Sequence, residues 1–381
     1  MFEAALKEFQ IPENQTYLNC AYMSPLVKSV EEAGMQGMIK KRNPGIITTN
    51  DFFEEGDLLR EEFAKLIGAD ESKRIAIIPS ASYGLATVAR NIKLLKGDNI
   101  VMAAEQFPSN YYSWQKACDQ HEAEMRIIKR PSSTHDSWNE NILHAIDSET
   151  KAVALPHAYW ADGYLFDLKK IRDKTRQVGA LLIIDGTQSV GALPFKIQEI
   201  QPDALICAGY KWLFGPYSIG LAYFGSYFDE GEPIEENWIN RDKSEDFAGL
   251  VNYKSDYQPY AIRYDVGEHS NFILVPMMLQ ALKLINSWDP KNIQAHCANI
   301  SEHALSKLEG SSFFVDKASE RSAHLFGIKF KHPIDSNLLM DKLKAEKISV
   351  SLRGNSIRVS PHIYNTTEDI EKLINILLQL K

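Results

Sequence analysis

The sequence has few cysteines, no long apolar run and no excess of basic residues, and each of these absences excludes a class of protein. Only four cysteines occur in 381 residues, without the spacing of metal ligands, so we expect reduced thiols in a cytoplasmic protein and no metal site. No apolar run approaches the ~20 residues that a transmembrane helix needs. The formal net charge of −8 argues against nucleic acid or an anionic membrane as the main partner.

A secretion signal and internal repeats are also missing, and the remaining composition is that of an ordinary globular enzyme. The N-terminus lacks the basic and apolar segments of a signal peptide. Hydrophobic residues make up 44% of the chain and charged residues 24%, which is typical of globular proteins. A chain of this length can bury a large core. We expect a large domain over residues 16–270 and a small α+β domain over 271–381 together with 1–15.

The centre of the sequence holds two short apolar runs that each end near a residue suited to chemistry. Leu181–Ile184 is followed by Asp185, and Ala204–Cys207 is followed a few residues later by Lys211. Short apolar runs bounded by turn residues indicate strands buried on both faces, as in a parallel sheet. Ligands of such sheets bind beyond the carboxyl ends of the strands. We therefore expect a carboxylate and an amine to meet in one crevice.

An amine and a carboxylate in one crevice suit pyridoxal phosphate, which bonds to a lysine and needs an acidic partner for its ring nitrogen. The motifs IIDGTQ (183–188) and GYKWLFGP (209–216) resemble those of the class V aminotransferase family of fold-type I pyridoxal phosphate enzymes, in particular its kynureninase-like and isopenicillin N epimerase-like branches. The resemblance extends over nearly the whole chain. It implies an α/β fold, with a mostly parallel seven-stranded sheet in the large domain and a small α+β C-terminal domain.

The same resemblance implies a role for each residue near the cofactor ring. Lys211 would be the Schiff-base lysine and the acid–base group at the substrate's Cα, while Asp185 would hold the ring nitrogen. Gln188 matches the position that touches the cofactor's phenolic oxygen. Phe107 lies in an FPSN motif (107–110) whose phenylalanine covers the ring face in kynureninase-like relatives, although without the resemblance it would be assigned to the core.

A phosphate site is predicted where a strand runs into a helix start. The strand 74–78 is followed by small hydroxyl residues and by a helix through Asn91, and a helix N-terminus favours an anion. Ser82 is the expected N-cap. The resemblance adds that Ser82 grips the phosphate, that Ala81 contributes its backbone, and that the hydroxyl of Tyr210 also binds the phosphate.

A buried arginine indicates the substrate's carboxylate. Arg358 lies within an apolar strand, 356–360, where a guanidinium needs an anionic partner, and the family's carboxylate-binding arginine falls at this position. A structural ion pair is the alternative. Arg353 either assists or lies on the surface. Trp160 stands where many relatives have an asparagine, so it is expected to shape the substrate pocket, and Asn19 is a further candidate substrate contact.

One further segment, residues 263–271, is expected to contribute to a homodimer, and another, at Ser24 and Pro25, is expected to begin a helix. In the family, a loop equivalent to residues 263–271 reaches the neighbouring subunit's site, so Ser270 and Asn271 are candidate cofactor contacts across a homodimer; a simple surface turn is the alternative. Ser24 and Pro25 are expected to open a helix, with serine as its N-cap.

The reaction is less specified than the cofactor. Amino-group transfer from a small α-amino acid to a keto acid is the first expectation, because it is the family's namesake reaction. Kynureninase-like or selenocysteine-lyase-like cleavage and epimerisation are the alternatives on the same scaffold, and a non-catalytic binding protein is the alternative outside enzymes. No cysteine occurs between Arg321 and Lys381, where desulfurases of this family carry their nucleophile, so persulfide chemistry of that kind is not expected.

Overall fold

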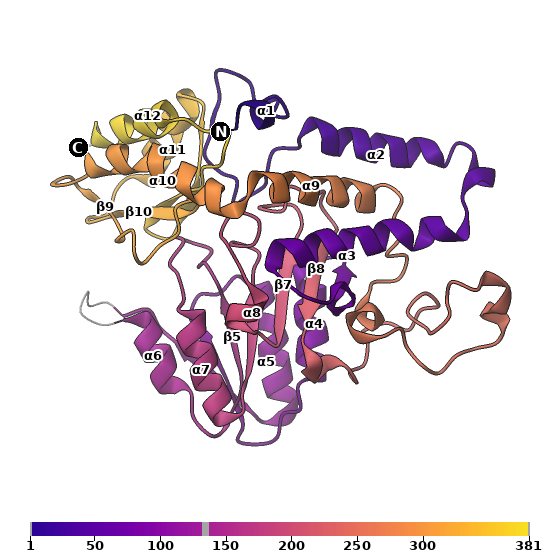
Figure 1. Cartoon of the computed structure of the whole chain (residues 1–381). Coiled ribbons are helices and arrows are strands. Elements are labelled where there is room, and N and C mark those ends of the chain that lie inside the picture. The colour runs from indigo at the N-terminus through magenta and orange to yellow at the C-terminus, as the bar shows by residue number, and fades with distance from the viewer. Residues whose placement is uncertain (1, 132–136, 380–381) are drawn as a thin grey trace.

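A seven-stranded sheet covered by helices on both faces forms the larger part of the computed structural model, which describes residues 2–131 and 137–379 (Figure 1). The strand order is β2–β8–β7–β6–β5–β3–β4, and only β8 runs antiparallel to its neighbours. The mostly parallel α/β fold that the sequence indicated is therefore confirmed. The strands are β2 (Ile75–Ile78), β3 (Asn99–Ala103), β4 (Glu124–Ile128), β5 (Thr150–Pro156), β6 (Leu181–Asp185), β7 (Ala204–Ala208) and β8 (Gly220–Phe224).

Alternate residues of these strands point to two different cores, as the two-residue period of a strand requires. In β6, Leu182 and Ile184 pack into one hydrophobic cluster with the helices α3, α6, α7 and α9, whereas Ile183 packs into the other with α4 and α5. Burial on both faces explains why the strands have continuous apolar sequences. The helices of these layers are α3 (Glu54–Ile67), α4 (Ala81–Asn91), α5 (Ser109–His121), α6 (Trp138–Ala145), α7 (Leu168–Val178), α8 (Ile197–Ile200) and α9 (Leu274–Trp288).

A second, four-stranded antiparallel sheet, in the order β12–β13–β10–β9, packs on the C-terminal helices around its own core. Figure 1 shows this lobe beside the two chain ends. The division into domains at residues 15 and 270 stays a prediction. The remaining elements are α1 (Glu3–Leu6), β1 (Thr16–Tyr17), α2 (Lys28–Lys40), α10 (Pro290–Ser306), β9 (Phe313–Val315), β10 (Phe326–Phe330), α11 (Ser336–Ala345), β11 (Ile348–Ser349), β12 (Ser351–Arg353), β13 (Ser356–Val359) and α12 (Thr367–Leu378).

The predicted helix start at Ser24 and Pro25 is wrong. Helix α2 begins at Lys28, and Val27 is its N-cap residue. The backbone N–H and the hydroxyl of Ser24 instead donate to the carbonyl of Tyr210, at 3.1 and 3.3 Å. A partner distant in sequence thus takes the hydrogen bonds that the local pattern assigned to a cap, and it fixes the N-terminal segment beside the residue that precedes Lys211. In the part of the chain that the structure describes, no helix is long and apolar enough to cross a membrane.

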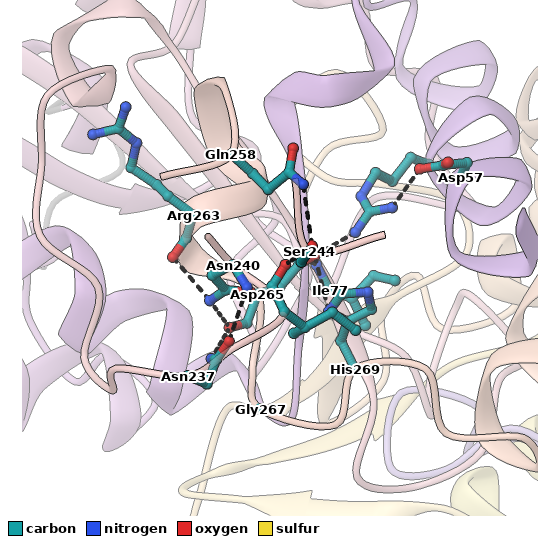
Figure 2. Close-up of polar contacts among 12 residues, drawn as sticks. Asp57, Ile77, Asn237, Asn240, Ser244, Gln258, Arg263, Asp265, Gly267 and His269 are labelled. Atoms are coloured by element: carbon teal, nitrogen blue, oxygen red, sulfur yellow. Dashed lines mark hydrogen bonds and ion pairs between the residues drawn. The ribbon is translucent and has the colours of Figure 1, made fainter. Parts of the chain in front are cut away.

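A buried polar cluster ties the edge strand β2 to the loop before α9 (Figure 2). Asp265 is fully buried, and its carboxylate accepts a hydrogen bond from the backbone N–H of Ile77 at 2.6 Å. The same carboxylate forms an ion pair with Arg60, which is 2% exposed. The Nδ1 atom of His269 lies 3.3 Å from the same carboxylate. The carbonyl of Asp265 accepts from the side chain of Asn240 at 2.8 Å. Four chain segments therefore meet at one residue, Asp265.

Removal of Arg60 should destabilise the protein strongly. The substitution Arg60→Met leaves the carboxylate of Asp265 buried without its cation, and breaking a buried pair in this way costs about 3–5 kcal/mol. Urea unfolding of the apoprotein measures the change. As a control, Lys96→Met removes an ion pair with Glu122 whose side chains are 79% and 70% exposed, and its cost should stay below about 1 kcal/mol. Equal effects of the two substitutions would contradict the structural role of the cluster.

Candidate active site

A cavity of about 350 Å³ opens at the carboxyl ends of the central parallel strands β5, β6 and β7, the place where ligands of such sheets bind. Its volume lies within the range of small-molecule sites. The cavity is lined by Pro79, Ser80, Ala81, Ser82, Gln106, Phe107, Ser109, Pro156, Trp160, Asp185, Thr187, Gln188, Ala208, Tyr210, Lys211, Tyr217, Ser218 and Ile219.

The predicted carboxylate and amine both line this cavity. Asp185 is the last residue of β6 and accepts a hydrogen bond from the backbone N–H of Thr187 at 3.0 Å. The hydroxyl of Thr187 in turn accepts from the N–H of Ala208, at the end of β7, at 3.1 Å. Burial raises the pKa of Asp185, while the hydrogen bonds from Thr187 oppose that shift. The carboxylate is thus held rigidly at the junction of the two strands.

Gly186 explains why the turn after Asp185 can pack so closely. A Cβ atom at this position would lie 2.7 Å from the side chain of Leu205 and 2.8 Å from those of Cys207 and Val190. These contacts are too short for any residue with a side chain. Glycine therefore lets the turn after β6 lie directly against β7, which keeps the carboxylate and the segment that carries the lysine close together.

The amine of Lys211 is almost wholly enclosed, with 6% of the residue exposed. Its pKa is lowered to about 8, mainly by burial; the charge of Asp185 opposes this shift, and the guanidinium groups of Arg358 and Arg353 add to it. Among the described residues, no carboxylate lies within ion-pair distance of the amine. About a tenth of the lysine is therefore uncharged at pH 7, and the uncharged amine is the form that attacks a carbonyl group.

An aromatic wall lies beside the amine. The Nζ atom of Lys211 is 5.2 Å from the centroid of the Phe107 ring. Phe107 packs edge-to-face against Trp160 at a centroid distance of 5.8 Å, and the indole N–H of Trp160 donates to the carbonyl of Glu105 at 2.8 Å. Phe107 is 39% exposed, so it is not the core residue that its sequence alone suggested. An open ring face lines the cavity next to the reactive amine.

The helix N-terminus predicted as an anion site also lines the cavity, but its cap is a different serine. Ser80 is the N-cap, and its hydroxyl accepts from the N–H of Tyr83 at 3.1 Å. Ser82 lies inside the first turn of α4, and its hydroxyl donates to that of Ser109 at 2.8 Å. The prediction of Ser82 as the N-cap is therefore wrong. Ala81 is the first residue of the helix, and its backbone N–H belongs to the group that a helix leaves without internal partners.

Gln188 and Tyr210 also line the cavity. The side-chain oxygen of Gln188 accepts from the indole N–H of Trp212 at 2.9 Å, and its nitrogen donates to the carbonyl of Ala21 at 3.2 Å. These bonds fix the amide and use only one of its two N–H groups. Tyr210 packs against Tyr217 with ring centroids 4.6 Å apart.

Arg358 lies next to the cavity wall without being among the lining residues. It is 2% exposed, one of its Nη atoms donates to the carbonyl of Trp160 at 3.0 Å, and its Nε atom has no hydrogen-bond partner in the described part of the chain. Burial, followed by the charge of Arg353, lowers the pKa of Arg358 to about 9. No ion pair to Arg358 occurs among the described residues, so the structural ion pair considered from the sequence is not found.

Three other candidate residues lie away from the cavity. Asn19 is 9% exposed and accepts a hydrogen bond from the hydroxyl of Ser351 at 2.9 Å, within a separate groove. Ser270 and Asn271 precede α9, and the side-chain oxygen of Asn271 accepts from the backbone N–H of Leu274 at 2.9 Å. The side-chain oxygen of Asn271 is thus already bonded within its own chain, at the start of α9. The contribution of Ser270 and Asn271 to a second copy's site, and the substrate contact of Asn19, stay predictions.

Sequence reasoning missed several lining residues. Gln106 and Ser109 flank the predicted Phe107, and Thr187 lies inside the IIDGTQ motif, so their positions in the sequence contained a usable signal. The Nε2 atom of Gln106 is buried without a partner among the described residues. Tyr217 and Ser218 follow the GYKWLFGP motif in a loop, and no local pattern marks them as part of the site.

These residues fit pyridoxal phosphate. The cavity combines a buried amine of lowered pKa, a carboxylate deep between two strands, an open aromatic face and a helix N-terminus. Each matches one part of that cofactor: its aldehyde, its ring nitrogen, its ring face and its phosphate.

The family model described as aminotransferase class-V matches residues 48–373, and the chain belongs to this family. Its cofactor is pyridoxal 5′-phosphate. The cofactor and the family expected from the sequence are thus confirmed.

Individual relatives differ in what they are named for. An uncharacterized aminotransferase of Bacillus subtilis, YcbU, is 29% identical over 84% of this chain and 83% of its own length. A kynureninase of Bacillus cereus is 23% identical, over 93% of this chain and 83% of its own. Among solved structures, the cystine C-S lyase C-DES, in complex with its product cysteine persulfide, superposes with a TM-score of 0.85 at 19% identity, covering 97% of this chain and 98% of its own. The last similarity supports the fold.

Uptake of the cofactor by the apoprotein should depend on pH with a midpoint near 8. Burial lowers the pKa of Lys211 to about 8, and only the neutral amine attacks an aldehyde. The rate should therefore fall as the pH is lowered through 8, whereas an exposed lysine would titrate near 10.4. The growth of cofactor-linked absorbance over a pH series measures the rate, and Lys211→Ala corrects for exposed lysines. A midpoint near 10.4 would contradict the burial of the amine.

Proposed function

We propose that this protein is an enzyme that acts at Cα of a small α-amino acid and transfers its amino group, with Lys211 as the Schiff-base lysine and the acid–base residue. The observation that carries the proposal is the amine of Lys211 and the carboxylate of Asp185 lining one cavity at the carboxyl ends of adjacent strands. Membership of the class V family supports it. When bound, pyridoxal phosphate withdraws electron density from the substrate's Cα.

The protein's contribution begins with holding the cofactor. Asp185 would accept a hydrogen bond from the ring nitrogen and would keep it protonated, because a buried carboxylate next to a cation favours the charged pair. Phe107 covers one ring face by offset stacking, worth about 0.5–1.5 kcal/mol beyond area burial. The remaining N–H of Gln188 donates to the phenolic oxygen.

The phosphate belongs at the N-terminus of α4. The backbone N–H groups of Ala81 and Ser82 point out of the first turn and favour a negative charge. The hydroxyl groups of Ser82 and Tyr210 add donors that line the same cavity. We further propose a cytoplasmic homodimer in which Ser270 and Asn271 of one copy complete the site of the other.

The substrate is held at its other end by Arg358, whose unpartnered Nε atom is available for an α-carboxylate, with Trp160 shaping the pocket. Arginine is suited to this role because its planar fork binds a carboxylate with two parallel hydrogen bonds. Lys211 would remove the proton from Cα of the bound substrate and, for amino-group transfer, would deliver it to the cofactor instead of returning it to Cα. A lowered pKa suits this task, because a general base works best when its pKa is close to the working pH.

Kynureninase-like cleavage is the second candidate, favoured by two specific observations. Phe107 and Tyr210 match the kynureninase-like motifs, and both lie within 5.4 Å, ring centroid to amine, of Lys211. Desulfurase chemistry through a cysteine is less well supported. Cys20, Cys118, Cys207 and Cys297 are all buried, and burial raises the pKa of each thiol, which disfavours a reactive thiolate.

The attachment residue and the reaction can be tested together. Borohydride should fix the cofactor on Lys211, as read by peptide mass, and Lys211→Ala should reduce turnover by at least about 100-fold, since a general base typically contributes that much. Incubation with single amino acids, without a keto acid, should convert the cofactor to its amine form.

The outcomes separate the candidates. Release of alanine from a larger substrate, without formation of the amine form, would favour cleavage over transfer. A cofactor spectrum that no amino acid alters would indicate a binding protein. Fixation of the cofactor at another lysine would contradict the proposal itself.

Asp185→Asn should weaken cofactor binding by about 10- to 100-fold, because a hydrogen bond to a charged group is worth about 1.5–3 kcal/mol. Equilibrium titration of the apoprotein with pyridoxal phosphate measures this change. Asp167→Asn, which alters the N-cap of α7 on an element that does not line the cavity, is the matched control and should leave the affinity unaltered. Equal affinities of the Asp185→Asn variant and the unaltered protein would contradict the assigned contact.

A further inference from the structure

The hairpin of β12 and β13 carries a second arginine on the same face as Arg358. In this antiparallel pair, Ser351 lies opposite Arg358 and Arg353 lies opposite Ser356. Side chains two residues apart on a strand, and side chains directly opposite each other on paired strands, share a face of a sheet. Arg353 and Arg358 therefore project from one face of one hairpin.

Both guanidinium groups contact the same residue of the cavity wall. An Nη atom of Arg358 donates to the carbonyl of Trp160 at 3.0 Å, and the guanidinium carbon of Arg353 lies 5.5 Å from the centroid of the Trp160 ring system. Trp160 itself lines the cavity. Arg353 is thus not a surface arginine remote from the site, which was one of the two possibilities left by the sequence.

Neither arginine has an anionic partner in the described part of the chain. Arg353 donates to the carbonyl of Leu352 at 2.8 Å, and its Nε atom is buried without a partner, as is that of Arg358. No ion pair to either side chain is formed by the described residues. The two cations also lower the pKa of Lys211 through their charge. Partly desolvated like charges on one face are costly unless an anion joins them.

A carboxylate bound bidentately by Arg358 uses both of its oxygens on that one guanidinium group. The α-carboxylate of the substrate would occupy Arg358 under the proposed function, which leaves Arg353 without an anionic partner beside the aromatic face of Trp160. We propose that the substrate carries a second acidic group on its side chain, and that Arg353 binds this group. The inference rests on the proposed function and narrows the substrate to the acidic α-amino acids, with a side chain ending in a carboxylate or a comparable anion.

Binding of simple acids to the holoenzyme tests this inference without any turnover. Succinate has two carboxylates and butyrate has one on a chain of equal length, and neither has an amine. Calorimetric titration should give at least about tenfold tighter binding of succinate, the factor expected for one additional charged hydrogen bond. Arg353→Gln should reduce this ratio to about twofold or less. Arg358→Gln should weaken the binding of both acids.

Arg90→Gln is the matched control, because Arg90 lies on α4 with a side chain that is 52% exposed; it should keep the ratio of the unaltered protein. Equal affinities for the two acids in the unaltered protein, or no binding of either, would overturn the inference. An equal loss for both acids in Arg353→Gln would also overturn it, since the two arginines would then share one carboxylate. Failure of the proposed function is read separately, as absence of borohydride-fixed cofactor on Lys211. If the protein transfers the amino group of alanine and shows no preference for succinate, the inference of an acidic substrate is refuted, while the proposed function still holds.

Discussion

The burial of one ammonium group without a direct counter-ion is the constraint on which the site depends. Lys211 is 6% exposed. The carboxylate of Asp185 favours the protonated form of its amine, and the guanidinium groups of Arg358 and Arg353 disfavour it. Desolvation is costly for an amine that stays charged. The fold places this buried amine where strands β6 and β7 end, and the result is a lysine whose pKa is lowered to about 8.

The parts of this arrangement that the sequence predicted are those set by local pattern. Asp185 and Lys211 could be predicted because each follows a continuous apolar strand, and because parallel strands end at one edge of a sheet. Arg358 could be predicted because a charge within an apolar strand requires a partner. The central sheet followed from the same alternation of strands and helices, and the resemblance of the motifs supplied the cofactor.

The parts that could not be predicted depend on partners distant in the chain. Ser80 and Ser82 are the same residue type two positions apart, so the sequence does not distinguish them as N-cap residues. The N-cap is the serine whose hydroxyl reaches the N–H of Tyr83, which is Ser80. Ser24 had the signature of a cap, but the carbonyl of Tyr210 took its hydrogen bonds. The position of Arg353 over Trp160 required both the register of a hairpin and the packing of the smaller sheet against the larger one. None of these contacts has a local sequence signal.

The residues that mark the family and the residues that would hold the substrate come from two different sheets. The proposed cofactor partners Asp185 and Lys211 lie at the ends of strands of the larger sheet, and relatives over most of the chain are named for different reactions. The arginines come from the antiparallel sheet, through the hairpin of β12 and β13. Under the proposed function, these arginines would set the orientation of the substrate in the cavity, and that orientation would decide which bond at Cα is broken. Under the proposed function, reaction specificity would therefore depend on how Arg353 and Arg358 are placed against Trp160, and a change in this contact would reorient the substrate without altering Lys211 or Asp185.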